Sequence, residues 1–418
     1  MTRNSWTKGT ELLVLVGATA VLMMIDPPLQ KEMATSGAQG HATPPAEANT
    51  PILILMVALG GVLLVSSSNW LSVYLAIELP TLSLFILAAQ KRGSGHSAES
   101  GLKYFVLGAL SSGLFLFGCA MMCGLTGGTS VPCTDLVLGQ APGGAMPPMG
   151  GLLITVALLF KLSAAPFHMW APDVYDGAPT TTTALLAIVP KVAIFSILVS
   201  IGPAVNILLI GAIFSMIVGA IGALNQTKIK RLLAYSGIGH MGFILWGMEI
   251  GSFESIQASL VYMILYVTMS ISIFAIILAL GVVRNLIVEF SGLSRREPTL
   301  AITLALTLLS IAGIPPLVGF LSKWLVLLPG VVNQYYLVSV LAVVCSVIAG
   351  VYYVRIVKII YFQADSSLLI GIKTLRRENR INLRKALLIG ASLYVIGFTI
   401  VSPNLLLQLA HWATVGLF

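Results

Sequence analysis

The chain has 418 residues, of which 57% are apolar and only 9% are charged, and its mean hydropathy is +0.97. This balance excludes an ordinary soluble enzyme of two or three domains and places the chain among membrane proteins. The formal net charge of +8 does not indicate a nucleic-acid partner, because the basic residues alternate between loops.

Apolar runs of about 17–25 residues recur along the chain and are long enough to cross a ~30 Å hydrocarbon layer as helices. Strands of a membrane barrel would instead alternate in polarity over about ten residues, so we predict an all-α polytopic membrane protein. Residues 1–418 are expected to form a single membrane domain. In chain order, the twelve expected transmembrane helices are residues 12–28, 51–67, 70–89, 102–125, 150–169, 180–201, 203–224, 231–248, 255–283, 299–328, 335–361 and 386–409.

Three segments between these spans have a different composition. Residues 29–50 and 126–149 are rich in small residues and proline, and both are expected to be flexible loops. Residues 364–385 are charged and are predicted to contain an amphipathic helix on the membrane surface.

Lysine and arginine are distributed unevenly between the two sides of this topology. Of the 23 basic residues, 18 fall in loops on one side, two fall on the opposite side and three lie within predicted spans. Basic loops remain on the cytoplasmic or matrix side of a membrane. Both termini are therefore expected to face away from the matrix or cytoplasm.

Prolines interrupt two of the apolar spans, at Pro166 and at Pro315–Pro316. If five-helix units begin near residues 50 and 203, the breaks fall about 116 and 113 residues into their units. Similar offsets favour a core of two inverted five-helix repeats, residues 50–202 and 203–362, since many transporters are duplicated in this way. The alternative is two unrelated proline kinks. The remainder would be a peripheral N-terminal helix, and an amphipathic segment with a C-terminal helix, at residues 12–28 and 363–418.

Four ionisable residues lie inside predicted apolar spans: Glu78, Lys161, Lys191 and Lys323. The first three are near span centres, and Lys323 follows the second proline break. Each charge near the bilayer centre opposes insertion by roughly 2.5–3.5 kcal/mol. The sum, on the order of 10 kcal/mol, is comparable to the net stability of a whole domain, so we predict that these residues have a function.

Two structural explanations compete with that prediction. A membrane lysine can extend its ammonium group towards an interface, but a residue at the midplane is about 15 Å from either interface. Alternatively, Glu78 could form a purely structural ion pair with one of the lysines.

Groups held in this environment can change protonation, because burial and a nearby opposite charge act on them in opposite senses. We hypothesise that Glu78 modulates Lys161, which passes its proton through water and polar side chains to Lys191. Lys323 would then be the terminal relay towards the opposite side. His168 and His240 are candidates for additional proton transfer, although each can equally be a hydrogen-bonding residue in a helix bundle.

Motifs for other chemistry are missing from the sequence. It has no Walker loop, no dinucleotide-binding glycine pattern and no iron–sulfur cysteine set, and the histidines have no metal-ligand spacing. We therefore expect neither a redox cofactor nor a metal site in this chain. No disulfide or metal role is expected for the four cysteines, Cys119, Cys123, Cys133 and Cys345.

The strings around these residues resemble the antiporter-like, proton-pumping subunits of NADH:ubiquinone oxidoreductase, respiratory complex I. YLAIELPTLSLFILAAQKR is similar to the segment around that family's membrane glutamate, here Glu78. FKLSAAPFHMW and VPKVAIF resemble its broken central helix and the next helix, with the two central lysines at Lys161 and Lys191. AYSGIGH and LSIAGIPPLVGFLSKW resemble the segment that ends in His240 and the second broken helix with the terminal lysine, Lys323.

These strings, together with YYVRIVKIIYF, cover residues 60–362, and the subunit 2 branch in its mitochondrial form is the nearest likeness. Fourteen-helix members begin two helices earlier, so this chain is expected to lack their first two. The resemblance implies a membrane-arm subunit of the mitochondrial inner membrane, or of a bacterial cytoplasmic membrane. Its partners would be other membrane-arm subunits, including neighbouring antiporter-like subunits, and lipids.

By the same resemblance, NAD, FMN, iron–sulfur clusters and ubiquinone would bind in other subunits, and their chemistry would drive proton transfer here. Two readings compete with this one. The chain could belong to a cation/proton antiporter, or it could be a scaffold whose buried charges are locked in ion pairs.

Overall fold

The computed structural model is helical, and the residues that it describes are 4–25, 49–91, 93–131, 149–202, 205–282, 284–363 and 382–417. Most of the two expected loops and of the expected amphipathic surface segment lie outside these ranges. The same is true of Cys133.

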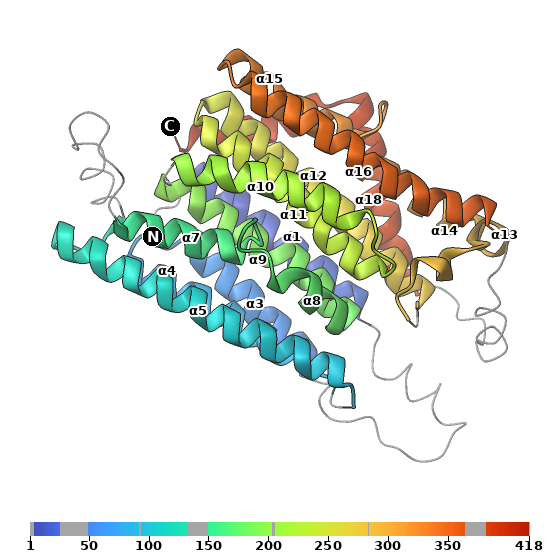
Figure 1. The fold of residues 1–418 in the computed structure, drawn as a ribbon, viewed down its shortest axis with the longest axis horizontal. Helices are drawn as coiled ribbons and strands as arrows, with labels where there is room; N and C mark the ends of the chain where they lie inside the picture. The colour runs from blue at the N-terminus through green and yellow to red at the C-terminus, as the bar shows by residue number, and fades with distance from the viewer. Residues whose placement is uncertain are drawn as a thin grey trace.

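The first half of the chain forms helices because a helix satisfies the backbone hydrogen bonds of each apolar run within the run itself. These helices are α1 (Ser5–Met24), α3 (Thr50–Val65), α4 (Trp70–Ala88), α5 (Gly95–Thr126), α7 (Met149–Lys161), α8 (Trp170–Gly177) and α9 (Thr180–Ile201). Helix α3 packs on α4, α5 packs on α7, and α1 packs on α9. They form one side of the bundle, coloured blue to green in Figure 1.

The second half continues the bundle on the other side of α9. Its main helices are α10 (Val205–Ala223), α11 (Ile229–Ile250), α12 (Phe253–Leu280), α14 (Pro298–Ala312), α15 (Val318–Val332), α16 (Tyr336–Phe362), α18 (Leu383–Val401) and α19 (Asn404–Val415). Between α12 and α14 lie a short 3₁₀ turn and the four-residue helix α13 (Leu293–Arg296). Helices α9 to α12 occupy the middle of the molecule (Figure 1).

Seven of the described helices are long and apolar enough to cross a membrane, and the number is eight if α18 and α19 are counted as one span. Shorter apolar helices of 10–17 residues account for α3, α7, α14 and α15. The chain is therefore a multi-pass helical membrane protein, as predicted.

Several helix boundaries differ from the sequence-based expectation, and α5 begins at Gly95 rather than at residue 102. Helix α1 begins at Ser5 rather than at residue 12, because Lys8 and Glu11 are accommodated within its first turns. The expected span 386–409 is two helices, bent by 92° between α18 and α19. Pro403 lies at that bend, where a proline cannot continue the backbone hydrogen bonding of the preceding helix.

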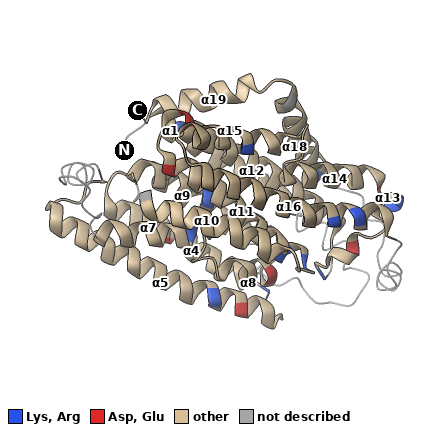
Figure 2. Ribbon diagram, turned by 45° about the horizontal axis from the view of Figure 1, so that its top comes forward, with Lys and Arg blue, Asp and Glu red and all other residues tan. Residues whose placement is uncertain are grey.

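The two ends of the described chain meet. The Asn4 side-chain amide donates a hydrogen bond to the Gly416 carbonyl at 3.2 Å. Figure 2 shows Lys and Arg gathered mainly at the other end of the bundle, around α8 and α13, with a few among the inner helices. The positive end and the termini thus lie at opposite ends of the helices.

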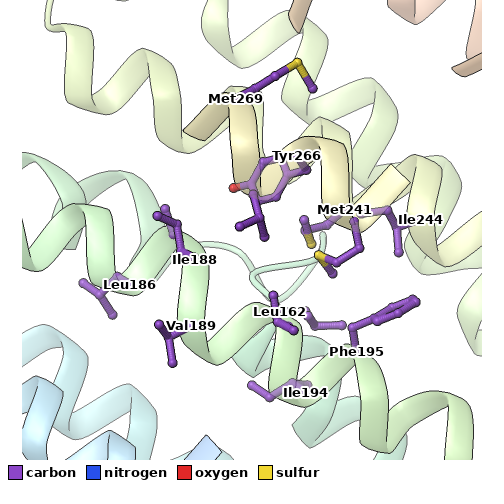
Figure 3. Packing of buried hydrophobic residues seen from close by; sticks show 14 of the residues in the cluster. Leu162, Leu186, Ile188, Val189, Ile194, Phe195, Met241, Ile244, Tyr266 and Met269 are labelled. Atoms are coloured by element: carbon purple, nitrogen blue, oxygen red, sulfur yellow. The ribbon is translucent and has the colours of Figure 1, made fainter. Parts of the chain in front are cut away.

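The centre of the bundle is closely packed apolar side chains from α9, α11 and α12 (Figure 3). Leu162, from the break after α7, packs beside Ile188, Val189 and Ile194 of α9. All four side chains are buried. This packing surrounds the ionisable residues predicted to carry function.

Candidate proton-transfer site

The two proline breaks have the same backbone construction, 150 residues apart. Ser163 and Gly313 have positive φ angles of 60° and 83°, and each lies three residues before a proline, Pro166 or Pro316. The N–H of the residue after each donates to the carbonyl five residues back, Ala164 to Leu159 at 3.0 Å and Ile314 to Leu309 at 3.3 Å. Helices α7 and α14 therefore end in equivalent turns.

An ammonium group lies at each of these turns. Lys161 is the last residue of α7, whereas Lys323 belongs to α15 and reaches back to donate to the Ala312 carbonyl at 2.7 Å. The Lys323 ammonium is thus at the carboxyl end of a half-helix, where the helix dipole stabilises positive charge. The sequence indicated that both lysines were buried, but not that both would lie at helix ends.

Glu78, at mid-length of α4, faces Lys161 across a small cavity. Both residues line a cavity of about 10 Å³ together with Ser111, Ser112 and Tyr74. The Lys161 ammonium donates to the Ser112 hydroxyl at 3.4 Å. One Glu78 carboxyl oxygen accepts from Thr81 at 3.3 Å, while Oε1 is buried without a hydrogen-bond partner among the described residues.

A second cavity, of about 20 Å³, adjoins Lys161 on its other side. Its lining includes Thr81, Tyr104 and Pro190. About 10–15 Å³ is enough for the centre of one water molecule, so this cavity can hold water between Lys161 and α9.

Lys191 is the most deeply buried of the three lysines, with 1% of its surface exposed. Its ammonium group donates to the Tyr266 hydroxyl at 3.2 Å and lies 5.9 Å from the centre of the Tyr175 ring. Figure 3 shows Tyr266 extending from α12 towards α9. Aromatic faces and one hydroxyl thus take the place of water around this cation.

His240 connects the environments of Lys191 and Lys323. Its ring lines two cavities of about 20 Å³, one shared with Tyr266 and Tyr175, and the other shared with Lys323 and Tyr353. Its Nδ1 is 2.8 Å from the Tyr262 hydroxyl. The His240 ring therefore lies between the surroundings of Lys191 and those of Lys323.

His168 is placed differently. It lies in the break between α7 and α8 and is half-buried, and it lines none of the four cavities described above. Its Nδ1 has no hydrogen-bond partner among the described residues. The structure thus places Glu78 beside Lys161, and His240 near both Lys191 and Lys323, and it leaves His168 apart from both groups.

None of the ion pairs found in the described chain includes Glu78, Lys161, Lys191 or Lys323. Those ion pairs are at the positive end, where Asp173 and Asp176 of α8 bind basic residues of α5 and α11. The pairs are Lys103–Asp173 at 3.1 Å, Arg231–Asp173 at 3.1 Å, Lys228–Asp176 at 2.8 Å and, within α5, Lys103–Glu99 at 2.7 Å.

Sequence reasoning missed the hydroxyl groups that link the lysines. Tyr266, Ser236 and Tyr353 line the cavities around His240, and Ser236 and Tyr353 are hydrogen-bonded to each other. Tyrosine and serine carry no charge, so they add little to the free energy of inserting an apolar helix into the membrane. They therefore do not stand out in the sequence. Ser236 and Tyr353 stand in the strings AYSGIGH and YYVRIVKIIYF that carry the family resemblance, whereas Tyr266 had no such signal.

Comparisons with known proteins agree with this geometry. Residues 67–349 match the family described as "NADH:quinone oxidoreductase/Mrp antiporter, TM". The chain is 77% identical over 384 residues to "NADH-ubiquinone oxidoreductase chain 2" of Metridium senile. The alignment covers 90% of this chain and 100% of that relative.

Two solved structures have the same fold. Respiratory complex I from Thermus thermophilus contains a chain with a TM-score of 0.80 and 29% identity, covering 98% of this chain and 87% of that one. The Mrp complex from Dietzia sp. contains a chain with a TM-score of 0.80 and 20% identity, covering 98% and 83% respectively. At that lower identity the likeness is one of fold.

Proposed function

Because the chain belongs to the NADH:quinone oxidoreductase/Mrp antiporter family, in its chain 2 branch, we propose that its buried ionisable residues carry protons across the membrane. It is a membrane-arm, antiporter-like subunit of respiratory complex I. The observation that carries the proposal is the series of water-sized cavities lined by Glu78, Lys161, His240 and Lys323.

Glu78 acts on Lys161 in this mechanism. The two share a cavity without forming an ion pair, so a small movement of α4 against α7 changes the separation of their charges. When the carboxylate approaches, it stabilises the protonated amine, and when it withdraws, the amine releases its proton. The unpartnered Glu78 oxygen leaves the carboxyl group free to make that movement.

From Lys161 the proton passes to Lys191, and from there to the second half of the chain. The Tyr266 hydroxyl accepts from Lys191 and adjoins the cavity lined by His240. His240 in turn lines the cavity that contains Lys323. Because the groups interact, their titration belongs to the whole series and not to single residues.

The wider architecture fits the same proposal. The equivalent turns at Ser163 and Gly313 support two inverted five-helix repeats, and counting each broken helix pair as one crossing gives twelve crossings. The chain contributes no redox centre of its own, and NADH oxidation and quinone reduction take place in other subunits. We place it in the mitochondrial inner membrane, with both termini away from the matrix and with other membrane-arm subunits and lipids around it.

The test is the variant Lys161→Ala in the assembled complex, reconstituted in liposomes. Proton pumping per NADH oxidised should fall, because the series loses its first lysine. Lys358→Ala, which removes an exposed lysine of α16, is the matched control and should pump normally. Normal pumping by Lys161→Ala would support a structural scaffold instead.

A cation/proton antiporter subunit is the competing function, and the likeness to the Mrp complex chain is the reason to test it. Purification of the chain from its native membrane, with its partners, distinguishes the two functions. We expect it in an assembly that oxidises NADH. Isolation with antiporter subunits, without NADH-oxidising activity, would contradict the proposal.

A further inference from the structure

Glu249, a second buried carboxyl group, lies near the end of α11 and has no part in the mechanism above. Its side chain is 7% exposed, and Oε2 is buried without a hydrogen-bond partner among the described residues. Burial of an ionisable group in this state is unfavourable. Its position relative to Lys323 suggests what it does.

Helices α11 and α15 are in contact along a seam that leads from Lys323 to Glu249. The Lys323 ammonium lies 5.7 Å from the centre of the Phe243 ring. One turn further along α11, Trp246 packs so closely on Gly330 of α15 that an added Cβ would be 2.3 Å from the indole. Residues three apart are neighbours on the surface of a helix, so Phe243, Trp246 and Glu249 follow one another along the side of α11 that meets α15.

This seam is polar as well as aromatic. The Trp246 Nε1 atom is buried and, like Glu249 Oε2, has no hydrogen-bond partner among the described residues. Buried polar atoms in proteins bond to other groups or to ordered water. Two such atoms on one helix face, between Lys323 and the helix end, provide hydrogen-bonding sites for water along the seam.

The seam opens at the end of the molecule that carries the termini. Helix α11 ends at Ile250, and Gly251 after it is exposed. The next helix, α12, contacts α19 there, with Phe253 5.2 Å from the His411 ring. This end is opposite to the positive end with α8 and α13, so a proton leaving Lys323 along the seam emerges on the far side of the membrane.

We propose that Glu249 is the outlet group of the second half of the chain, receiving through water the proton that leaves Lys323. This inference rests on the function proposed above. In the step, the N–H bond of the Lys323 ammonium breaks to leave a neutral amine, and an O–H bond forms on the Glu249 carboxylate. The carboxyl group then loses the proton to water beyond Gly251 and regains its charge.

Tyr335 is the positioning residue of this outlet. It lies in the turn between α15 and α16, and the neighbouring Glu249 carboxylate raises the pKa of its phenol. The phenol therefore stays protonated and keeps a neutral hydroxyl group beside the carboxylate. Its backbone N–H is fixed by the Gly330 carbonyl at 2.9 Å.

The experiment compares Glu249→Gln with Lys323→Ala and with the double variant, in the assembled complex in liposomes. Glu249→Gln keeps the shape of the side chain but cannot exchange a proton. It should lower pumping per NADH oxidised by the same fraction as Lys323→Ala, and the double variant should lose no more than either single variant. Glu254→Gln, an exposed carboxylate in the first turn of α12, is the matched control and should pump normally.

The two proposals fail in different ways. Normal pumping by Glu249→Gln with reduced pumping by Lys323→Ala overturns the outlet and leaves the lysine relay intact. Normal pumping by both variants overturns the relay itself.

If Glu249→Gln does not assemble, Glu249→Asp provides the measurement, because it keeps a carboxyl group but moves it back from Tyr335. Pumping by this variant should slow at least twofold and change its pH profile. An unchanged profile in an assembled complex would assign Glu249 a structural role.

Discussion

Gly237 of α11 provides the space in which Lys191 meets Tyr266. A Cβ atom at this position would lie 3.0 Å from the lysine Nζ and 3.2 Å from the tyrosine hydroxyl. An alanine methyl group here would therefore press on both atoms of this hydrogen bond and displace them by a few tenths of an ångström. The same is not true of Gly239, two residues later, where the nearest atom to an added Cβ would be 3.8 Å away.

We predict that Gly237→Ala separates Lys191 from Tyr266 and slows proton transfer between them. A hydrogen bond to a charged group contributes about 1.5–3 kcal/mol. If that free energy is lost from the transfer step, the rate of proton transfer should fall at least about tenfold. The initial rate of proton uptake by liposomes containing the complex measures the effect. Gly113→Ala on α5, which adds its methyl group in open space, is the control, and an equal rate in the two variants would argue against a role for the Lys191–Tyr266 contact.

At the residue scale, the sequence singled out Glu78 and the three lysines as candidates, but neither Glu249 nor the neutral hydroxyl groups. Glu78 and the lysines stood out because a charge in an apolar run is energetically costly. Tyr266 did not, since a tyrosine in an apolar helix is ordinary. His168 and His240 looked alike in sequence, and only the packing of α11 against α12 and α15 distinguishes them.

Helix α15 begins closer to the end of α14 than any side chain would allow. A Cβ on Gly319, the second residue of α15, would lie 1.7 Å from the Ser310 carbonyl oxygen. The Gly319 N–H also donates to the Ser310 side chain at 3.3 Å. This approach of two half-helices holds the Lys323 ammonium at the end of α14.

Gly319→Ala is expected to force the half-helices apart and to destabilise the subunit by about 1–3 kcal/mol or more, as overpacking does. Gly350→Ala on α16 adds its methyl group in open space and, by helix propensity, should be neutral or stabilising by up to about 1 kcal/mol. The stability of the two variants is compared by the half-life of their pumping activity at raised temperature. Equal half-lives would contradict the close approach of α14 and α15.

At the element scale, apolar run length predicted which segments are helical, and proline predicted where two helices break. The bend between α18 and α19 was missed, although Pro403 was visible, because apolar residues continue on both sides of it. The start of α1 was missed because Lys8 and Glu11 interrupt its apolar pattern. Hydropathy reports solubility in lipid, whereas helix ends depend on backbone hydrogen bonds.

For the molecule as a whole, the meeting of the chain ends gives a test of topology. Cysteine introduced at Asn4 or His411, both exposed at the termini, should react with a membrane-impermeant maleimide from one side only. Cysteine at Glu297, exposed beside α13, should react only from the other side. The parent chain gives the background from its native cysteines, and labelling of all three positions from one side would contradict the proposed orientation.

At this scale the sequence predicted the class of protein and the separation of charge between the two ends, because both follow from composition and loop order. The ion pairs of Asp173 and Asp176 with α5 and α11 were not predictable, since they depend on the packing of segments far apart in sequence. These half-exposed pairs contribute about 1 kcal/mol or less each. They align helix ends more than they stabilise the bundle.

The apolar packing of Leu162, Ile188, Val189 and Ile194 has a consequence for energy conservation (Figure 3). Val189 and Ile194 form part of the wall of the cavity beside Lys161, whereas Lys191 lines none of the four small cavities. A continuous chain of water molecules at this point would let protons flow back across the membrane, and the energy of the proton gradient would be lost as heat. In this structure the apolar packing blocks such a chain of water. Each turnover must therefore admit water there only briefly.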